Sequence, residues 1–156
     1  MKKLSVLLII IMLVSLVACK SNTAEDKPAE SSGKEEVVAM KVLIKVNGAE
    51  LTATLGDNSS AKALYELLAK GDVTVNAHDY GNFEKVGNLP QSLPRNDEDI
   101  TTSAGDIILY QGSSICFYYS TNSWDFTRLG RIDDAGKLNL KEIYGNGDAV
   151  FVLSVL

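Results

Sequence analysis

The stretch MKVLIKVNGAELTATL, residues 40–55, decides the fold of this chain. Apolar and polar residues alternate on both sides of the pair Asn47-Gly48. Alternation with a period of two is typical of a strand that buries one face. Asn-Gly is also the preferred pair for a two-residue type I′ turn, whose twist matches that of the flanking strands. The stretch therefore predicts an antiparallel β-hairpin at the start of the folded region.

A single principal helix is predicted directly after this hairpin, at about residues 59–70. Asn58 or Ser59 is suited to cap its first turn, and Gly71 is suited to end it. Its apolar stripe consists of Ala61, Leu64, Leu67 and Leu68.

The rest of the chain is predicted to be mainly β. The expected elements are a short strand from Val73 to His78, an irregular segment over residues 79–100, a hairpin pairing 107–110 with 115–119, a strand over 126–132, a short helix or turn at 137–143 and a strand over 149–156. Many short strands with one real helix are typical of a closed antiparallel β-barrel. We expect the helix to cover an open end of the barrel and the last strand to pair with the opening hairpin.

The N-terminus has the layout of a secretory signal peptide. Lys2 and Lys3 precede an apolar run from Leu4 to Val17, which is shorter than the roughly 20 residues of a transmembrane helix. The tetrapeptide Leu16-Val17-Ala18-Cys19 resembles the lipobox of bacterial lipoproteins. That resemblance implies cleavage before Cys19 and a diacylglyceryl group on its thiol. The alternatives are an uncleaved anchor or a signal peptide cut elsewhere.

Three regions are therefore expected: a lipoprotein signal peptide (1–18), a lipidated Cys19 with a disordered tether (19–39), and one domain (40–156). The tether is rich in Ser, Glu, Lys and Ala and lacks aromatic residues, so it cannot bury enough surface to fold. Two acyl chains would hold the protein firmly in a bilayer. The expected localisation is the extracytoplasmic face of the cell membrane, lipid-anchored.

Composition limits the partners. Residues 19–156 contain 13 basic and 20 acidic residues, which disfavours nucleic acid and anionic membrane surfaces as partners. With Cys19 acylated, Cys116 has no partner for an intrachain disulfide. We expect a monomer whose stability comes from a packed core.

Several short stretches, taken in order, resemble the bacterial cyclophilin-like family of small β-barrel domains. The matching stretches are the opening hairpin, Asn58-Ser59-Ser60-Ala61, Asp79-Tyr80-Gly81-Asn82-Phe83-Glu84, Leu89-Pro90, Gly105-Asp106-Ile107, Phe117-Tyr118 and Leu129-Gly130-Arg131-Ile132. The resemblance implies a barrel related in fold to the cyclophilin prolyl isomerases. It does not imply their activity, because the Phe-His-Arg signature of those enzymes is missing here.

The candidate site rests on a concentration of aromatic residues between Tyr80 and Phe126. Alternation along residues 115–119 places Ile115, Phe117 and Tyr119 on one face of a strand and the intervening residues on the other. We expect one set to form core and the other to line a shallow groove, built from residues 78–95 and 118–128. The alternative is that every aromatic is core or barrel wall. The residues expected to bind a ligand are His78, Tyr80, Phe83, Arg95, Tyr118, Trp124 and Arg128.

Arg95 and Arg128 suggest a carboxylate-bearing peptide or metabolite, since arginine binds carboxylates bidentately. Signals for catalysis are weak: His78-Asp79 is a possible acid–base pair, but no serine lies in a nucleophile motif and Cys116 is typical of a strand filler. No catalytic residue, cofactor or metal site is predicted. The favoured function is a non-catalytic module that binds a peptide or small molecule. The alternatives are a diverged prolyl isomerase and a scaffold for a partner envelope protein.

Lipid anchoring is tested by Cys19→Ser. We expect the wild-type protein to partition into membranes with a fatty acyl group on residue 19, and the variant to lose both properties. Mass spectrometry of the mature N-terminus and membrane fractionation measure this. A wild-type N-terminus without an acyl group would contradict the prediction.

Overall fold

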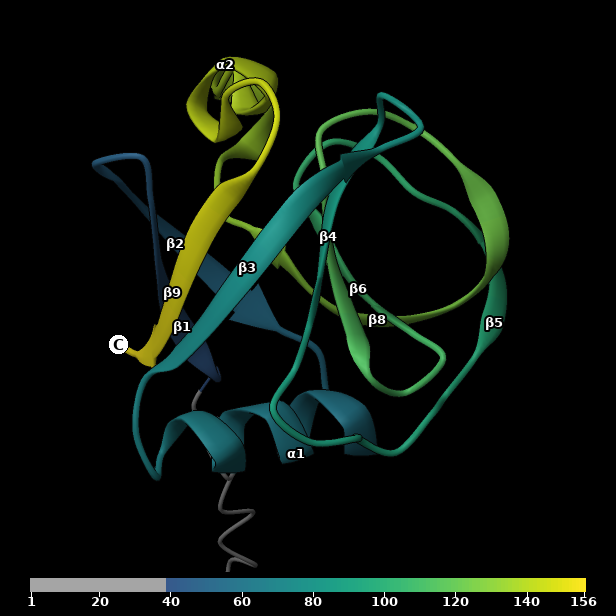
Figure 1. Ribbon diagram of the computed structural model, residues 1–156. Helices are drawn as coiled ribbons and strands as arrows, with labels where there is room; N and C mark the ends of the chain where they lie inside the picture. The colour runs from purple at the N-terminus through teal and green to yellow at the C-terminus, as the bar shows by residue number, and fades with distance from the viewer. Residues whose placement is uncertain (1–38) are drawn as a thin grey trace, which may run out of the picture. The chain divides into compact units, whose positions relative to one another are not determined.

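Nine strands, two α-helices and one 3-10 turn make up residues 39–156, the part of the chain that this computed structural model describes (Figure 1). The predicted signal peptide, Cys19 and tether lie outside the described residues, apart from residue 39. The elements are β1 (Lys41–Val46), β2 (Ala49–Leu55), α1 (Ser59–Leu68), β3 (Val73–Tyr80), β4 (Glu84–Asn88), β5 (Glu98–Thr101), β6 (Asp106–Tyr110), β7 (Ser114–Tyr118), β8 (Ser123–Ile132), η1 (Ala135–Lys137), α2 (Leu140–Tyr144) and β9 (Ala149–Val155).

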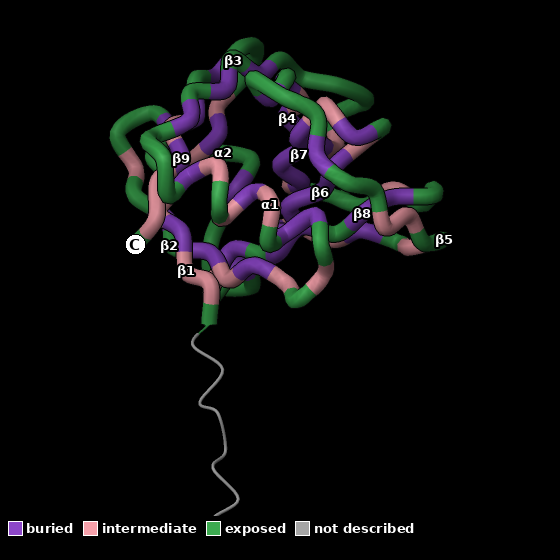
Figure 2. The backbone as a smooth tube through the Cα atoms, turned by 90° about the horizontal axis from the view of Figure 1, so that it is seen from below, coloured by how far each residue is buried: buried purple, intermediate pink, exposed green. Residues whose placement is uncertain are grey.

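The strands form a closed barrel in which every pairing is antiparallel, as predicted. Their order is β2-β1-β9-β3-β4-β7-β6-β8, and β2 pairs with β8 to close the ring. Strand β5 stands outside the ring and pairs only with the first residues of β8. Figure 2 shows β5 as a largely exposed segment, in agreement with its burial pattern.

The opening hairpin forms as predicted. Asn47 and Gly48 both have positive φ, at 48° and 81°, as a type I′ turn requires. Strand β9 pairs with β1 from Val42 to Val46, which confirms the expected contact between the last strand and this hairpin.

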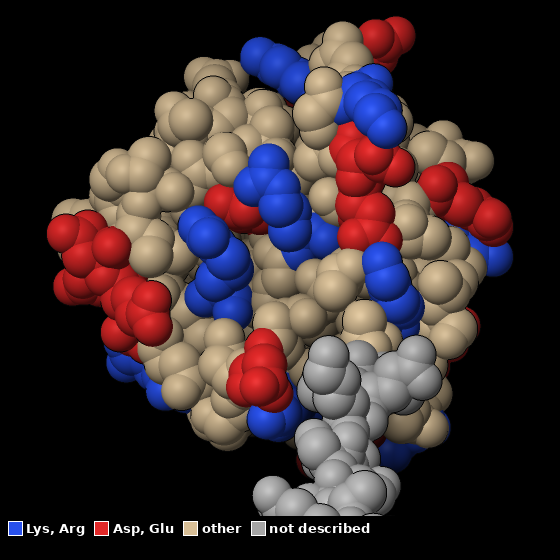
Figure 3. All heavy atoms as spheres, turned by 180° about the vertical axis from the view of Figure 1, so that it is seen from behind, with Lys and Arg blue, Asp and Glu red and all other residues tan. Residues whose placement is uncertain are grey.

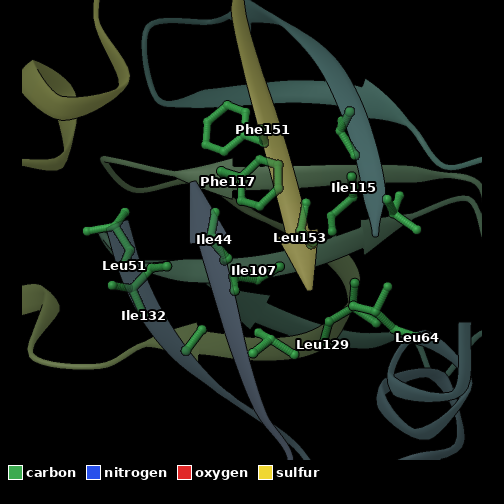
Figure 4. Close-up of a cluster of buried hydrophobic side chains, with 14 of the residues drawn as sticks. Ile44, Leu51, Leu64, Ile107, Ile115, Phe117, Leu129, Ile132, Phe151 and Leu153 are labelled. Carbon is green, nitrogen blue, oxygen red and sulfur yellow. The ribbon is translucent and has the colours of Figure 1, made fainter. Parts of the chain in front are cut away.

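The core fills the inside of the barrel (Figure 4). The rings of Phe117 and Phe151 are stacked at its centre, with centroids 4.0 Å apart. Helix α1 contributes Leu64 and Leu68 to the same core. Its N-cap is Asn58, whose side-chain oxygen accepts a hydrogen bond of 2.8 Å from the Ala61 N–H. The helix ends at Leu68, slightly earlier than predicted.

The prediction that residues 79–100 are irregular is wrong in part, because residues 89–97 are irregular but the rest of the segment contains strands. Strand β3 continues to Tyr80, β4 covers Glu84–Asn88 and β5 covers Glu98–Thr101. Strand β4 buries both Glu84 and Lys85, and β5 is mostly exposed. Neither strand therefore shows the apolar–polar alternation by which a half-buried strand is recognised.

Lys, Arg, Asp and Glu side chains are intermingled on the face seen in Figure 3, and that face has no continuous patch of basic residues. Within residues 39–156, no helix is long and apolar enough to cross a membrane.

Barrel closure is tested by Gly130→Ala. A Cβ atom at Gly130 would lie 2.5 Å from the Thr54 carbonyl oxygen, across the pairing of β2 with β8. We expect a loss of roughly 1–3 kcal/mol in the free energy of unfolding, the usual cost of overpacking. Urea denaturation measures it. The control is Gly136→Ala, where an added Cβ meets nothing within 4 Å and stability should change by no more than about 0.5 kcal/mol. Equal effects of the two substitutions would contradict the prediction.

Candidate functional site

A pocket of about 860 Å³ lies on the outer face of the barrel, over strands β3, β4, β6 and β7 and beside the first part of β8. We call it the outer pocket. Inward-facing residues of β3, such as Val75 and Ala77, belong to the core, so the alternate residues Asn76, His78 and Tyr80 face outward and line the pocket.

The register of the sheet arranges the outer residues in rows. Residues directly opposite each other on paired strands have neighbouring side chains. Three rows cross this face: Tyr80, Glu84 and Tyr118; His78, Val86, Cys116 and Ile108; and Asn88, Ser114 and Tyr110. The first row is aromatic with a carboxyl at its centre, and the third is mostly polar.

Aromatic side chains form the base and rim of the outer pocket at the Glu84 end. Phe83 stacks on the buried Tyr118, with centroids 6.0 Å apart, and Tyr80 meets Phe83 edge to face. Phe126 also contacts Tyr118, edge to face. Trp124 and Tyr80 are the most open of these residues, 62% and 59% exposed. Single exposed aromatics are common, but a rim of them beside a pocket is typical of a binding site.

Glu84 is the most unusual residue of the pocket. It is only 6% exposed, and within residues 39–156 its Oε2 atom has no hydrogen-bond partner. Burial raises the pKa of its carboxyl, while the neighbouring Tyr118, Cys116 and His78 side chains act in the opposite direction. The buried Tyr118 hydroxyl lies beside this carboxyl, and among the described residues it too makes no hydrogen bond of normal geometry. Buried polar groups without partners destabilise a fold, so the free carboxyl oxygen in the pocket lining points to a ligand.

The next residue along the chain, Lys85, provides a contrast. It is fully buried on the opposite face of β4, but its Nζ lies 2.9 Å from Asp79 and donates to the Gly147 carbonyl at 2.5 Å. Tyr119 also donates to Asp79. Partial burial acts to raise the pKa of Asp79, yet the hydrogen bonds from Lys85, Tyr119 and the Gly147 N–H leave it lowered. This cluster is fully paired and holds the end of the barrel together.

The structure also resolves the possible acid–base pair of His78 and Asp79. His78 faces the outer pocket, whereas Asp79 belongs to the Lys85 cluster on the other face of β3. The two side chains therefore do not form a catalytic pair. Cys116 is buried, and burial followed by the nearby Glu84 charge raises the pKa of its thiol, which makes it unreactive.

Of the seven residues expected to bind a ligand, His78, Tyr80, Phe83 and Trp124 line the outer pocket, and Tyr118 lies buried behind its lining. Arg95 and Arg128 do not line it. Arg95 pairs with Asp97, and Arg128 pairs with the buried Asp106 at 3.3 Å. Alternation along β7 is as expected: Ile115, Phe117 and Tyr119 contact the main core, while Cys116 and Tyr118 belong to a second cluster under the pocket.

The expected groove, residues 78–95 and 118–128, contains Glu84, Val86, Asn88 and Asn122, but the sequence did not single them out as ligand-binding residues. Asn76, Tyr110 and Ser114 of the lining lie outside that groove. The only available signal for Glu84 was an acidic residue between the apolar Phe83 and Val86 in a segment that also contains glycine turns. Among the residues that the structure describes, no group of three or more His, Cys, Asp and Glu side chains is placed to hold a metal ion.

A family model described as the Cyclophilin-like family matches residues 44–152, which is more than half of the chain. The chain belongs to the cyclophilin-like family. Its barrel is similar to the solution structure of a hypothetical protein from Archaeoglobus fulgidus, with a TM-score of 0.57 and 18% sequence identity. The match covers 79% of this chain and 99% of that one, and at this identity it shows the fold alone. No curated protein matches the chain.

Glu84→Gln tests the cost of the buried carboxyl in this cyclophilin-like domain. Because the folded-state pKa is raised, ionised Glu84 destabilises the fold at neutral pH, and the penalty disappears below the ordinary glutamate value of 4.5, where the carboxyl is protonated in both states. We expect the variant to be more stable than wild type at pH 7, by on the order of 1 kcal/mol. The gain should fade as pH falls toward 4.

Urea unfolding at several pH values measures this difference. The control is Glu66→Gln on the exposed face of α1, which should leave stability nearly unchanged at every pH. A loss of stability in Glu84→Gln at pH 7 would show that the carboxylate is well satisfied and would contradict the prediction.

Proposed function

We propose that this protein is a lipid-anchored protein of the cell envelope whose cyclophilin-like domain binds a small molecule or a short peptide in the outer pocket without chemical turnover. The anchoring part rests on the lipobox-like Leu16-Val17-Ala18-Cys19. The binding part rests on one observation: the buried Glu84 carboxyl has an oxygen without a partner at the base of an aromatic pocket.

Binding without turnover agrees with the chemistry of the lining. His78 and Asp79 do not form an acid–base pair in the pocket, since Asp79 is engaged by Lys85 on the other face of β3. The thiol of Cys116 is buried. Nothing in this lining activates a nucleophile in the way that covalent catalysis requires.

The prolyl isomerase alternative has less support. A cyclophilin uses an arginine to hydrogen-bond the proline amide beside an apolar pocket. The three arginines of the domain, Arg95, Arg128 and Arg131, all pair with carboxylates, and none lines the outer pocket. We therefore expect the purified protein not to accelerate X-Pro isomerisation at enzyme-like rates.

The binding function is tested with a fragment library, read out by tryptophan fluorescence and by thermal unfolding. Trp124 is the only tryptophan of the chain and lies at the pocket rim, so its emission reports directly on occupancy. We expect a set of ligands that shift this emission and raise the melting temperature.

Trp124→Ala should weaken these ligands about tenfold in the thermal assay while changing the free energy of unfolding by no more than about 0.5 kcal/mol, because the side chain is exposed. The control is Leu138→Ala, another exposed apolar residue that does not line the pocket. A fall in stability of about 3–5 kcal/mol in Trp124→Ala would instead mark Trp124 as core and remove it from the site. A library without any Trp124-dependent ligand would overturn the proposed function.

A further inference from the structure

We infer that the outer pocket recognises a cationic nitrogen group, such as a primary or methylated ammonium, which pairs with Glu84 between aromatic rings. This inference rests on the proposed binding function and names the ligand class of the same site.

The charges of the pocket favour a cation. Among the described residues, Glu84 is the one acidic residue of the lining, His78 is its one basic residue, and neither lysine nor arginine lines the pocket. Residues 39–156 as a whole carry fifteen acidic and ten basic side chains. A ligand carboxylate would meet a like charge at Glu84 and no arginine or lysine to offset it. An ammonium group would instead pair with the carboxylate and relieve its desolvation.

The unpartnered Oε2 atom is what makes this pairing specific. A structural carboxylate in a barrel wall is normally satisfied, as the buried Asp106 is by Arg131 at 2.7 Å and by Arg128. Glu84 has no lysine or arginine partner among the described residues; the basic side chain near it is His78, and its Oε2 atom makes no hydrogen bond. It therefore keeps an acceptor free for a donor that comes from outside, and ammonium groups are donors only.

The surrounding rings supply the second part of the recognition. The face of an aromatic ring attracts cations through its quadrupole, and tryptophan does so best. Tyr80 and Phe83 lie in the lining beside Glu84, and Trp124 and Phe126 belong to the same lining, with Tyr110 at its Asn88 end. Aromatic rings around a single carboxylate are suited to both primary and methylated ammonium groups, because cation–π attraction does not depend on an N–H donor.

The residues at the far end of the pocket limit the length of the ligand and the groups that it can carry at its other end. Asn88 lies four residues along β4 from Glu84, which corresponds to roughly 13 Å at the usual rise of a strand. Ser114 and Asn76 lie at the same end, with the Ser114 hydroxyl 3.2 Å from the Asn88 side-chain oxygen. An elongated ligand with an ammonium at one end and an amide or hydroxyl at the other fits this order of groups.

The experiment compares matched probes that differ in charge. The purified protein is titrated with choline, its neutral carbon isostere 3,3-dimethylbutan-1-ol and the anion 3,3-dimethylbutyrate, and in parallel with n-butylammonium, 1-butanol and butyrate. Trp124 emission gives the dissociation constants. We expect at least one cation to bind tenfold or more tightly than both of its uncharged and anionic counterparts.

Glu84→Gln should weaken the cation at least tenfold and leave the neutral isostere unchanged. The control is Asp148→Asn, an exposed acidic residue that lines a neighbouring depression over β3 and β9 but not the outer pocket, and it should not alter cation binding. The comparison of isosteres on the wild-type protein does not depend on how any variant folds.

Equal or tighter binding of the neutral or anionic probe would overturn the inference, as would cation binding that Glu84→Gln does not change. In both cases a Trp124-dependent ligand would leave the proposed function standing. Absence of binding by either cation at millimolar concentration also overturns the inference, whereas the fragment library decides the proposed function separately.

Discussion

The pairing of β2 with β8 is the constraint on which the rest of the structure depends, because it closes the sheet. Closure satisfies both edges of the ring and encloses a core around Phe117 and Phe151. It requires close backbone contact at Gly130. Strand β8 is long enough to do more than close the barrel: its last residues pair with β2, whereas its first residues pair with β5 and bring Trp124 to the outer pocket. One strand thus joins the stability of the fold to the shape of the site.

Two adjacent residues of β4 show the difference between a buried charge that is paired within the fold and one that is left for a ligand. Lys85 is buried with an ion pair to Asp79 and a hydrogen bond to Gly147, so its burial is compensated within the chain. Glu84 is buried on the other face, and one of its oxygens has no hydrogen-bond partner among the residues that the structure describes. Proteins tolerate such uncompensated groups mainly where binding requires them, at some cost in stability.

The sequence predicts most of the fold because its clearest signals are local. The Asn47-Gly48 turn, the capped helix after Asn58 and the alternation of the last strand are readable without knowledge of tertiary contacts. Strands β4 and β5 were not readable, since one is buried on both faces and the other is exposed.

The site was predictable only in part for the same reason. The aromatic Tyr80, Phe83 and Trp124 stand out in the sequence, but the importance of Glu84 depends on a register that places it between Tyr80 and Tyr118. The ion pair between Arg128 and Asp106 is likewise a long-range contact, which the spacing of residues along the sequence does not reveal.

The strict in-and-out alternation of β4 has a consequence for how such a domain can diversify. Glu84, Val86 and Asn88 face the pocket, while Lys85 and Gly87 face inward, where Gly87 lies close to the backbone of β3. Substitutions at the outward positions change the chemistry offered to a ligand without altering the interior packing. The same barrel can therefore acquire a new ligand preference through one or two replacements on a single strand, by natural drift or by laboratory redesign, while its folding determinants remain intact.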